Sequence, residues 1–348
     1  MSLRGPGKIV RPHRATLGAL PVDIGIEDWR RRIVDDAQDF TPHDLRLMQG
    51  LAQRVAAVRP ELVNDDATLG ELAWVWGKDH STLGDTWRRR LWYRRDELVG
   101  WGWIYLPHRV AYSDGSVSNA SKAYLSWQIH PDRPDVLDEI LDWYDGEARG
   151  ADHRTTVRAA DTDALNRLAA HGYLIDAGNA ADDGYWVQVN ARDLTDVEEP
   201  TLPPGFRFRT ADEVGPEAAV RAHVDAWHPS SFTELGFEGV RRTWPYRPDL
   251  HVLLEAPDGA LVSTAVIWLD GHNRTAEFEP VGTHRGYRRR GLGRSLLLHG
   301  MHRAREAGAT RMIVTSLGGA AHPAARGLYY SAGFEPFTRA VPHIRPAG

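Results

Sequence analysis

The sequence predicts an α/β protein of the α+β type, in which two domains of similar design follow one another. The chain has 348 residues, and at about 150 residues per domain this length suggests two domains. A segment near residues 196–205 is acidic, rich in proline and without hydrophobic periodicity, which is typical of a linker. The order of strands and helices predicted after this segment recurs loosely before it. We therefore expect two tandem domains, each with a mixed, mostly antiparallel sheet flanked by helices.

Composition excludes several other classes of protein. Hydrophobic residues make up 42% and charged residues 26% of the chain, as in soluble globular proteins. No stretch reaches the roughly 20 apolar residues of a membrane span, and no apolar segment follows the basic N-terminus as in a secretory signal. A net charge of -5 argues against nucleic-acid binding. The absence of cysteine excludes disulfides, thiolate metal sites and a cysteine nucleophile. We expect a cytoplasmic protein with no membrane or nucleic-acid partner.

The linker divides the chain into a first domain at 1–195 and a second at 206–348, with residues 196–205 between them. In the first domain, Thr41 is a good N-cap and Pro42 a good first residue for a helix with one apolar face. The remaining elements expected there are a hairpin of strands 87–95 and 98–106, a strand at 122–130 and a helix at 135–148.

The second domain begins with a short strand and a helix that starts at a proline. Pro257 to Ala260 then form a hairpin signal between two apolar runs. A long helix is expected to end at Gly308, because glycine is the commonest residue just beyond a helix. The predicted elements are strands 206–210, 251–256, 261–269, 275–283, 312–315 and 334–344, and helices 216–227, 296–307 and 323–331.

The strongest local signal is the pattern Arg288-x-x-Gly291-x-Gly293 between a strand and a long helix. Glycines allow a tight turn and close approach of a ligand, and the first amides of a helix are unpaired donors at its positive end. The pattern therefore predicts a pyrophosphate-binding loop. Leu296 replaces the third glycine of a dinucleotide fingerprint, and no Lys-Ser/Thr pair follows as in a P-loop. The alternative is a glycine loop that merely begins a helix beside solvated arginines.

The stretch from Glu277 to Phe334 resembles the GNAT superfamily of acyl-CoA-dependent N-acyltransferases. The matching pieces are a strand end, the glycine loop, a helix, a strand and a final helix with its L-Y-x-x-x-G-F sequence, here 281–283, 288–293, 296–307, 312–315 and 328–334. The resemblance covers about 207–338 and is faint over the first domain. The overall plan resembles the tandem-domain members of this superfamily, such as the mycothiol synthases.

This resemblance implies acetyl-CoA as co-substrate and no metal. It implies that Val281, Gly282 and Thr283 pair with pantetheine, and that amides of the glycine loop hold the pyrophosphate. The residues expected at the loop are Arg288, Arg289, Arg290, Gly291, Leu292, Gly293, Arg294 and Ser295. Tyr329 would be the general acid that protonates the leaving thiolate. His322 is a further expected cofactor contact, and it stands where these enzymes commonly have asparagine.

Transfer to an amine also needs a group that takes a proton from the amine near neutral pH. Glu277 and Glu279 are two residues apart, so they share one face of the strand that precedes the loop. Either glutamate is a candidate base, and both could equally be acceptor-binding anions or solvated side chains. In the first domain, residues 131–135 contain no glycine and Leu168 stands in the place of the tyrosine. We expect this domain to be a degenerate repeat without a pyrophosphate site.

The predicted function is transfer of an acetyl group from acetyl-CoA to a primary amine of a small molecule, by direct attack in a ternary complex. The main alternative is an acyl-CoA-binding sensor without catalysis, and an intact Tyr329 favours the enzyme, because a sensor needs no acid for a thiolate. A nucleic-acid-binding module is disfavoured by the negative net charge. His299 and His302 lie three apart on a helix, but they lack a third metal ligand. The acceptor and the oligomeric state stay open.

Overall fold

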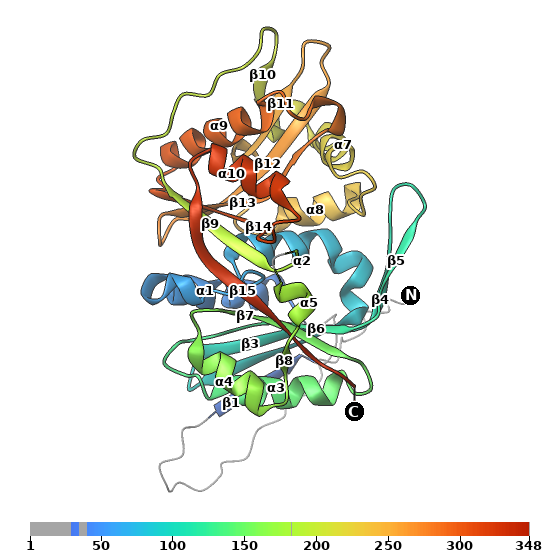
Figure 1. Cartoon of the computed structure of the whole chain (residues 1–348), viewed down its shortest axis with the longest axis vertical. Helices are drawn as coiled ribbons and strands as arrows, with labels where there is room; N and C mark the ends of the chain where they lie inside the picture. The colour runs from blue at the N-terminus through green and yellow to red at the C-terminus, as the bar shows by residue number, and fades with distance from the viewer. Residues whose placement is uncertain (1–28, 35–39, 182, 348) are drawn as a thin grey trace, which may run out of the picture.

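The computed structural model describes residues 29–34, 40–181 and 183–347, and within them a thirteen-stranded sheet runs through both halves of the molecule (Figure 1). The strands of its first half lie in the order β1, β2, β3, β6 and β7. They span Trp29–Val34, Trp87–Arg94, Glu97–Tyr105, Ala123–Ile129 and His153–Arg158. All neighbours in this half are antiparallel except β6 and β7, which are parallel. A separate hairpin of β4 (His108–Ala111) and β5 (Val117–Ala120) extends from this half toward the other.

The second half of the sheet continues in the order β9, β14, β13, β12, β11 and β10. These strands span Val187–Asp193, Arg311–Leu317, Thr275–Thr283, Leu261–Asp270, His251–Glu255 and Arg207–Thr210. Only β13 and β14 are parallel; the other pairs are antiparallel. The mixed, mostly antiparallel sheet expected from the sequence is therefore confirmed.

One strand joins the two halves of the sheet. The first part of β15 (Glu335–Arg345) pairs with β9, and its residues from Ala340 onward pair with β7. The short β8 (Leu174–Ile175) adds to β15 beside the main path. Residues 196–205 hold neither helix nor strand, as a linker would, yet β9 precedes them and lies between two strands that follow them. The linker divides the sequence after β9, whereas β9 belongs to the second half of the sheet. The boundary in the sequence therefore differs from the boundary in the sheet.

Helices cover both faces of the sheet. The first half carries α1 (Pro42–Val58), α2 (Leu69–Leu83), α3 (Val136–Glu147), α4 (Thr162–Ala170) and the short α5 (Ala177–Ala180). Thr41 caps α1 as expected, through a reciprocal pair of bonds with Asp44. Tryptophans fill the core between α1, α2 and the strands, where Trp87, Trp101 and Trp103 are almost fully buried. In the part of the chain that the structure describes, no helix has the length and apolar character needed to cross a membrane.

The second half carries the short α6 (Ala211–Val214), then α7 (Pro216–Ala226), α8 (Glu234–Arg242), α9 (Leu292–Glu306) and α10 (Pro323–Ser331). Helix α9 packs on one face of the sheet, with Gly300 against the ring of Phe278. Helices α7 and α2 cover the opposite face, so a helix of the first half helps to bury the sheet of the second.

Helices α2 and α8 approach each other very closely at the junction of the two halves. A Cβ atom on Gly239 would lie 2.1 Å from the carbonyl oxygen of Gly77, so both positions depend on the absence of a side chain. This contact fixes α2 against the second half. The sequence analysis did not predict α2 or α8, although it placed most of the elements around them within a few residues.

Candidate active site

The parallel strands β13 and β14 pair over only half of their length. Their ladder runs from Thr275 opposite Arg311 to Phe278 opposite Val314, and then the strands separate. The register of β13 on its other neighbour, β12, shifts between Phe278 and Val281, where the strand bulges. Beyond this point the side of β13 that faces β14 carries no ladder partner in the described structure. An extended ligand could pair with this free edge as an added strand.

The glycine loop follows β13 and ends at the N-terminus of α9. Gly291 is the N-cap and has a φ of 79°, a left-handed conformation that favours glycine. A Cβ atom there would meet no atom within 4 Å, so a side chain would project into open space. The amide of Ser295 already donates to the carbonyl of Gly291, and the free amides of the helix are those of Leu292, Gly293 and Arg294. These three amides form an anion-binding end.

A cavity of about 780 Å³ lies between the free edge of β13, the N-terminus of α9 and helix α10. It brings together most of the cofactor-binding residues that the sequence predicts. Those that line it are Val281, Gly282, Thr283, Arg288, Arg289, Gly291, Leu292, Gly293 and Arg294, together with Tyr329.

Several arginines of the loop hold the loop itself. Arg288 donates from Nε to the carbonyl of Thr283 at 2.9 Å and from Nη2 to the carbonyl of Ala226 at 3.1 Å. Arg294 donates to the carbonyl of Ser331 at 2.7 Å. These bonds tie the loop to β13, α7 and α10, and the positive charges remain beside the cavity.

Three of the expected cofactor residues do not line the cavity. Arg290 lies over the ring of Tyr287 at 4.9 Å. The hydroxyl of Ser295 is turned to the carbonyl of Thr201, at 2.5 Å. His322 begins α10 and packs on Tyr185 with 4.4 Å between the ring centroids.

Trp227, which the sequence did not mark as a site residue, forms one side of the cavity. Its ring lies over Gly282, where an added Cβ atom would be only 2.3 Å from the ring. Gly282 therefore has two roles. It belongs to the free strand edge, and its lack of a side chain allows the ring of Trp227 to lie close to the strand. Nothing near Trp227 in the sequence marks it, because its partner lies on a distant strand.

Tyr329 lies on α10 with its side chain toward the cavity and only 6% of its surface exposed. Its ring packs edge-on against Phe334, with centroids 5.9 Å apart. Burial raises the pKa of Tyr329 above its ordinary value, and the negative charge of Glu279 raises it further. The phenol therefore keeps its proton at neutral pH and can donate it.

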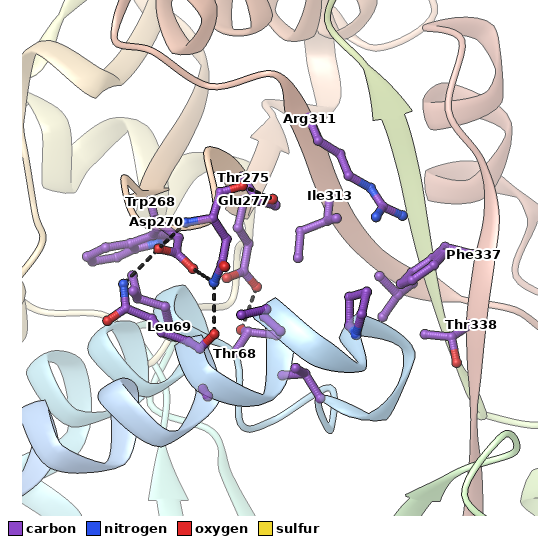
Figure 2. A pocket seen from close by; sticks show the side chains of 18 of the residues that line it. Thr68, Leu69, Trp268, Asp270, Thr275, Glu277, Arg311, Ile313, Phe337 and Thr338 are labelled. Carbon is purple, nitrogen blue, oxygen red and sulfur yellow. Dashed lines mark hydrogen bonds between the residues drawn. The ribbon is translucent and has the colours of Figure 1, made fainter. Parts of the chain in front are cut away.

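The structure separates the two candidate glutamates. The carboxylate of Glu277 accepts a bond of 2.6 Å from the hydroxyl of Thr68, which Figure 2 shows. It accepts a second bond, of 3.0 Å, from the amide of Gly70, and both donors lie at the start of α2. Burial raises the pKa of Glu277 to about 7, although these two bonds oppose the shift. Its surroundings form a separate cavity of about 400 Å³ between α1 and the sheet.

Glu279 acts on the 780 Å³ cavity through its negative charge, which raises the pKa of Tyr329. Burial raises the pKa of Glu279 to about 8, and the charge of Glu277 adds to the effect. It lines a third cavity, of about 240 Å³, together with Trp227. Since Trp227 lines both this cavity and the one beside Tyr329, the two cavities are neighbours.

The first half has a related pair of parallel strands, but the space between them is filled. Strands β6 and β7 pair from Ala123 to Leu125 only. The segment 62–64 then bonds to both: Asn64 donates to the carbonyl of Trp127 at 2.8 Å, and Arg158 donates to the carbonyl of Val63 at 2.6 Å. Leu168, which stands in the place of the tyrosine, is fully buried. The chain's own backbone therefore occupies the gap that stays open in the second half.

The splayed strands, the helix N-terminus and the buried phenol lie together at one cavity. Residues 217–334 match the family model described as the acetyltransferase (GNAT) family. This part of the chain, which contains α9, α10 and the 780 Å³ cavity, is thus a GNAT domain. Acyl-CoA-dependent acetyl transfer is the activity of this family. No curated protein matches the sequence.

Solved structures of GNAT proteins share the fold over nearly the whole chain. A tandem GNAT protein from the clavulanic acid biosynthesis pathway aligns with a TM-score of 0.61 at 16% identity, over 92% of this chain and 99% of that one. A GCN5-related N-acetyltransferase from Sphaerobacter thermophilus aligns with a TM-score of 0.56 at 20% identity, over 92% and 96%. A GNAT-family acetyltransferase from Colwellia psychrerythraea gives 0.51 at 13%, over 90% and 99%. The chain therefore has a tandem GNAT fold.

Proposed function

We propose that this chain transfers an acetyl group from acetyl-CoA to a primary amine of a small molecule, with both substrates bound at once. The observation that carries the proposal is the composition of one cavity. It combines an unpaired strand edge, three free helix amides and a buried tyrosine. Each of these groups has a role in holding or cleaving a thioester of coenzyme A.

The residues present fit acetyl-CoA. The amides of Leu292, Gly293 and Arg294 would hold the pyrophosphate, because they are unpaired donors at the positive end of α9. The backbone of 281–283 would pair with the pantetheine amides as a strand does. Bound acetyl-CoA would supply the thioester carbonyl that the amine attacks.

We assign the proton transfers to Glu279 and Tyr329. The amine nitrogen forms a bond to the carbonyl carbon and loses one proton to the carboxylate of Glu279, directly or through water. The bond from carbon to sulfur breaks, and the thiolate takes a proton from the hydroxyl of Tyr329. A base with a pKa near 8 and a phenol that keeps its proton are suited to these roles at neutral pH.

We assign Glu277 to the contact between the two halves. Its two carboxylate oxygens already accept bonds from Thr68 and Gly70. A carboxylate bonded in this way is a weaker base than its neighbour, and it faces a cavity that Trp227 and Tyr329 do not line. The sequence left the choice between the two glutamates open.

The experiment is turnover of acetyl-CoA measured by release of free thiol, against a panel of primary amines. The chain contains no cysteine, so the protein itself adds no thiol to the signal. In the variant Tyr329→Phe the ring is kept and only the hydroxyl is lost. We expect the rate to fall at least about tenfold, the lower end of general acid catalysis, with unchanged affinity for CoA.

Tyr330→Phe is the matched control, because Tyr330 is the next residue and is 39% exposed. It should keep full activity. Normal turnover in Tyr329→Phe would remove this tyrosine from the mechanism. Tight binding of CoA without turnover of any amine would contradict the enzyme and favour a sensor of acyl-CoA.

A further inference from the structure

The 240 Å³ cavity beside Glu279 is built from both halves of the molecule. Helix α2 contributes Trp74 and Lys78, and the β4–β5 hairpin contributes Tyr112. The connection between α7 and α8 contributes the remaining wall, which includes Trp227 and Phe232. This volume is below the roughly 300–1,000 Å³ of sites for drug-sized ligands. The cavity therefore suits a small molecule.

The walls of this cavity are mainly aromatic. The ring centroids of Trp74 and Phe232 are 5.0 Å apart, and those of His223 and Trp227 are 4.2 Å apart in a stacked arrangement. His223 also lies 4.4 Å from Phe232, so the four rings form one connected group. Burial lowers the pKa of His223 to about 3, which leaves this ring neutral. Such walls favour an apolar or aromatic body and attract a cation to their faces.

The charges of the cavity favour an amino group. Glu279 is the only carboxylate among the described residues that line it. The one cation of the lining, Lys78, is already paired with Asp79 at 2.7 Å. An amine bound here would meet Glu279 at the side of the cavity that adjoins Trp227.

The β4–β5 hairpin is fixed in place over this cavity. The amide of Ser113 donates to the carbonyl of Ser230 at 2.8 Å, and the amide of Ser230 donates to the hydroxyl of Ser113 at 3.1 Å. These two bonds join the tip of the hairpin to the connection between α7 and α8. Figure 1 shows the hairpin rising from the first half beside α8. The first half thus contributes one wall of the cavity beside Glu279.

We infer that this aromatic cavity is the acceptor pocket, and that the acceptor is a small primary amine with an aromatic body, such as an arylalkylamine. The inference rests on the proposed function for the reaction itself, but it concerns a separate set of residues. The aromatic body would lie against the cavity side of Trp74, Trp227 and Phe232, and the amino group would lie at Glu279. The first half would not catalyse the reaction, but its residues would determine which amine is acetylated.

The experiment compares kcat/KM for phenethylamine with the values for phenylalanine, glucosamine, spermidine and an aminoglycoside. We expect phenethylamine to be preferred at least tenfold. Phenylalanine carries a carboxylate that the charge of Glu279 would repel, and the other three are polar or too large for the cavity. A preference for any of these four would overturn the inference and leave acetyl transfer intact.

A variant that fills the cavity tests the place of binding. Ser231→Trp should raise the KM for phenethylamine at least tenfold without changing the affinity for CoA, because Ser231 lines only the 240 Å³ cavity. Ser81→Trp is the control, since Ser81 is exposed on α2 outside the described lining of this cavity. Tyr112→Ala, on the exposed hairpin, is a milder variant and should raise the same KM several-fold.

A binding measurement separates this inference from the proposed reaction. Calorimetric titration of the CoA-loaded protein with phenethylamine should show binding that Ser231→Trp abolishes and Ser81→Trp preserves. This result would support the pocket even if no amine in the panel were acetylated. Absence of phenethylamine binding, or binding that is the same in Ser231→Trp, would overturn the inference.

Discussion

At the scale of single residues, Gly291 and Glu277 matter most. Gly291 has open space where a side chain would be, and Glu277 is buried. Gly291 has a positive φ, and a side chain there would enter the cavity rather than contact protein. Glu277 is buried against two donors of the other half. The ligand that we propose limits which residue can stand at position 291, and the junction between the halves limits which residue can stand at position 277.

Gly291→Val should weaken binding of CoA at least tenfold, because the branched side chain would occupy the place of the pyrophosphate. The positive φ alone costs a non-glycine residue about 1–2 kcal/mol. Gly150→Val controls for this strain, since Gly150 has a φ of 84°, an equally open Cβ position and no place in the cavity lining. Calorimetry should show weaker CoA binding in the first variant only. Equal affinities in the two variants would contradict the pyrophosphate site.

Glu277→Gln should change how the stability of the protein depends on pH. The pKa of Glu277 is 4.5 when unperturbed and about 7 in the folded protein, so between these values the folded state holds a proton that the unfolded state has lost. Stability attributable to this group therefore falls as pH rises from about 4.5 to about 7, by on the order of 3 kcal/mol, and stays low above pH 7.

Urea unfolding at a series of pH values would measure this slope. Glu277→Gln should remove the share of the slope that belongs to Glu277, while Asp66, Glu71 and Glu279, whose pKa values burial also raises, keep the rest. Glu335→Gln, at an exposed glutamate, should leave the slope unchanged. The same slope in wild type and Glu277→Gln would show that Glu277 is not a buried titrating group. The sequence could not distinguish Glu277 from Glu279, because the partner Thr68 is 209 residues away in the chain.

At the scale of elements, strand β15 connects the two halves through main-chain bonds. Its first residues complete the sheet beside β9, and its last residues complete the sheet beside β7. The sequence analysis predicted extended chain at 334–344 but gave no partner for it, because alternation of residues marks a strand and not its neighbours. Helix α2 was missed for a different reason. Its N-cap sequence Thr68-x-x-Glu71 was a usable signal that the abundance of tryptophan nearby obscured.

Removal of residues 340–348 should lower the melting temperature of both halves together, because it deletes the ladder with β7 and leaves an open sheet edge. Calorimetry of the full chain should show one cooperative transition. Removal of 346–348 alone is the control, since these residues form no strand in the described structure. Two separate transitions in the full chain would contradict a single cooperative unit.

At the scale of the whole molecule, the two halves share a fold and differ in the space between their parallel strands. In the second half β13 and β14 leave an edge free, and in the first half the segment 62–64 bonds into the equivalent gap. The sequence predicted this asymmetry from the absence of glycine in 131–135. It could not predict the filling segment, which comes from a connection with no marked pattern of its own.

Titration with CoA should therefore give one site per chain. The gap in the first half is closed by bonds between buried groups, and Gln128, which takes part in them, is only 2% exposed. The Gly291→Val variant should lose the single site, which would place it in the second half. Two sites per chain in calorimetry, one of them kept in that variant, would show that the first half also binds CoA.

The placement of β15 also affects how the protein is made. Ribosomes deliver β15 after every other described strand, so until it emerges β7 and β9 both lack a neighbour. Neither half can complete its sheet before β15 has emerged, and the open edges are surfaces on which chains can pair wrongly. Contacts that join distant parts of a chain also slow folding. A chaperone that covers these edges until β15 emerges should therefore raise the yield of folded protein.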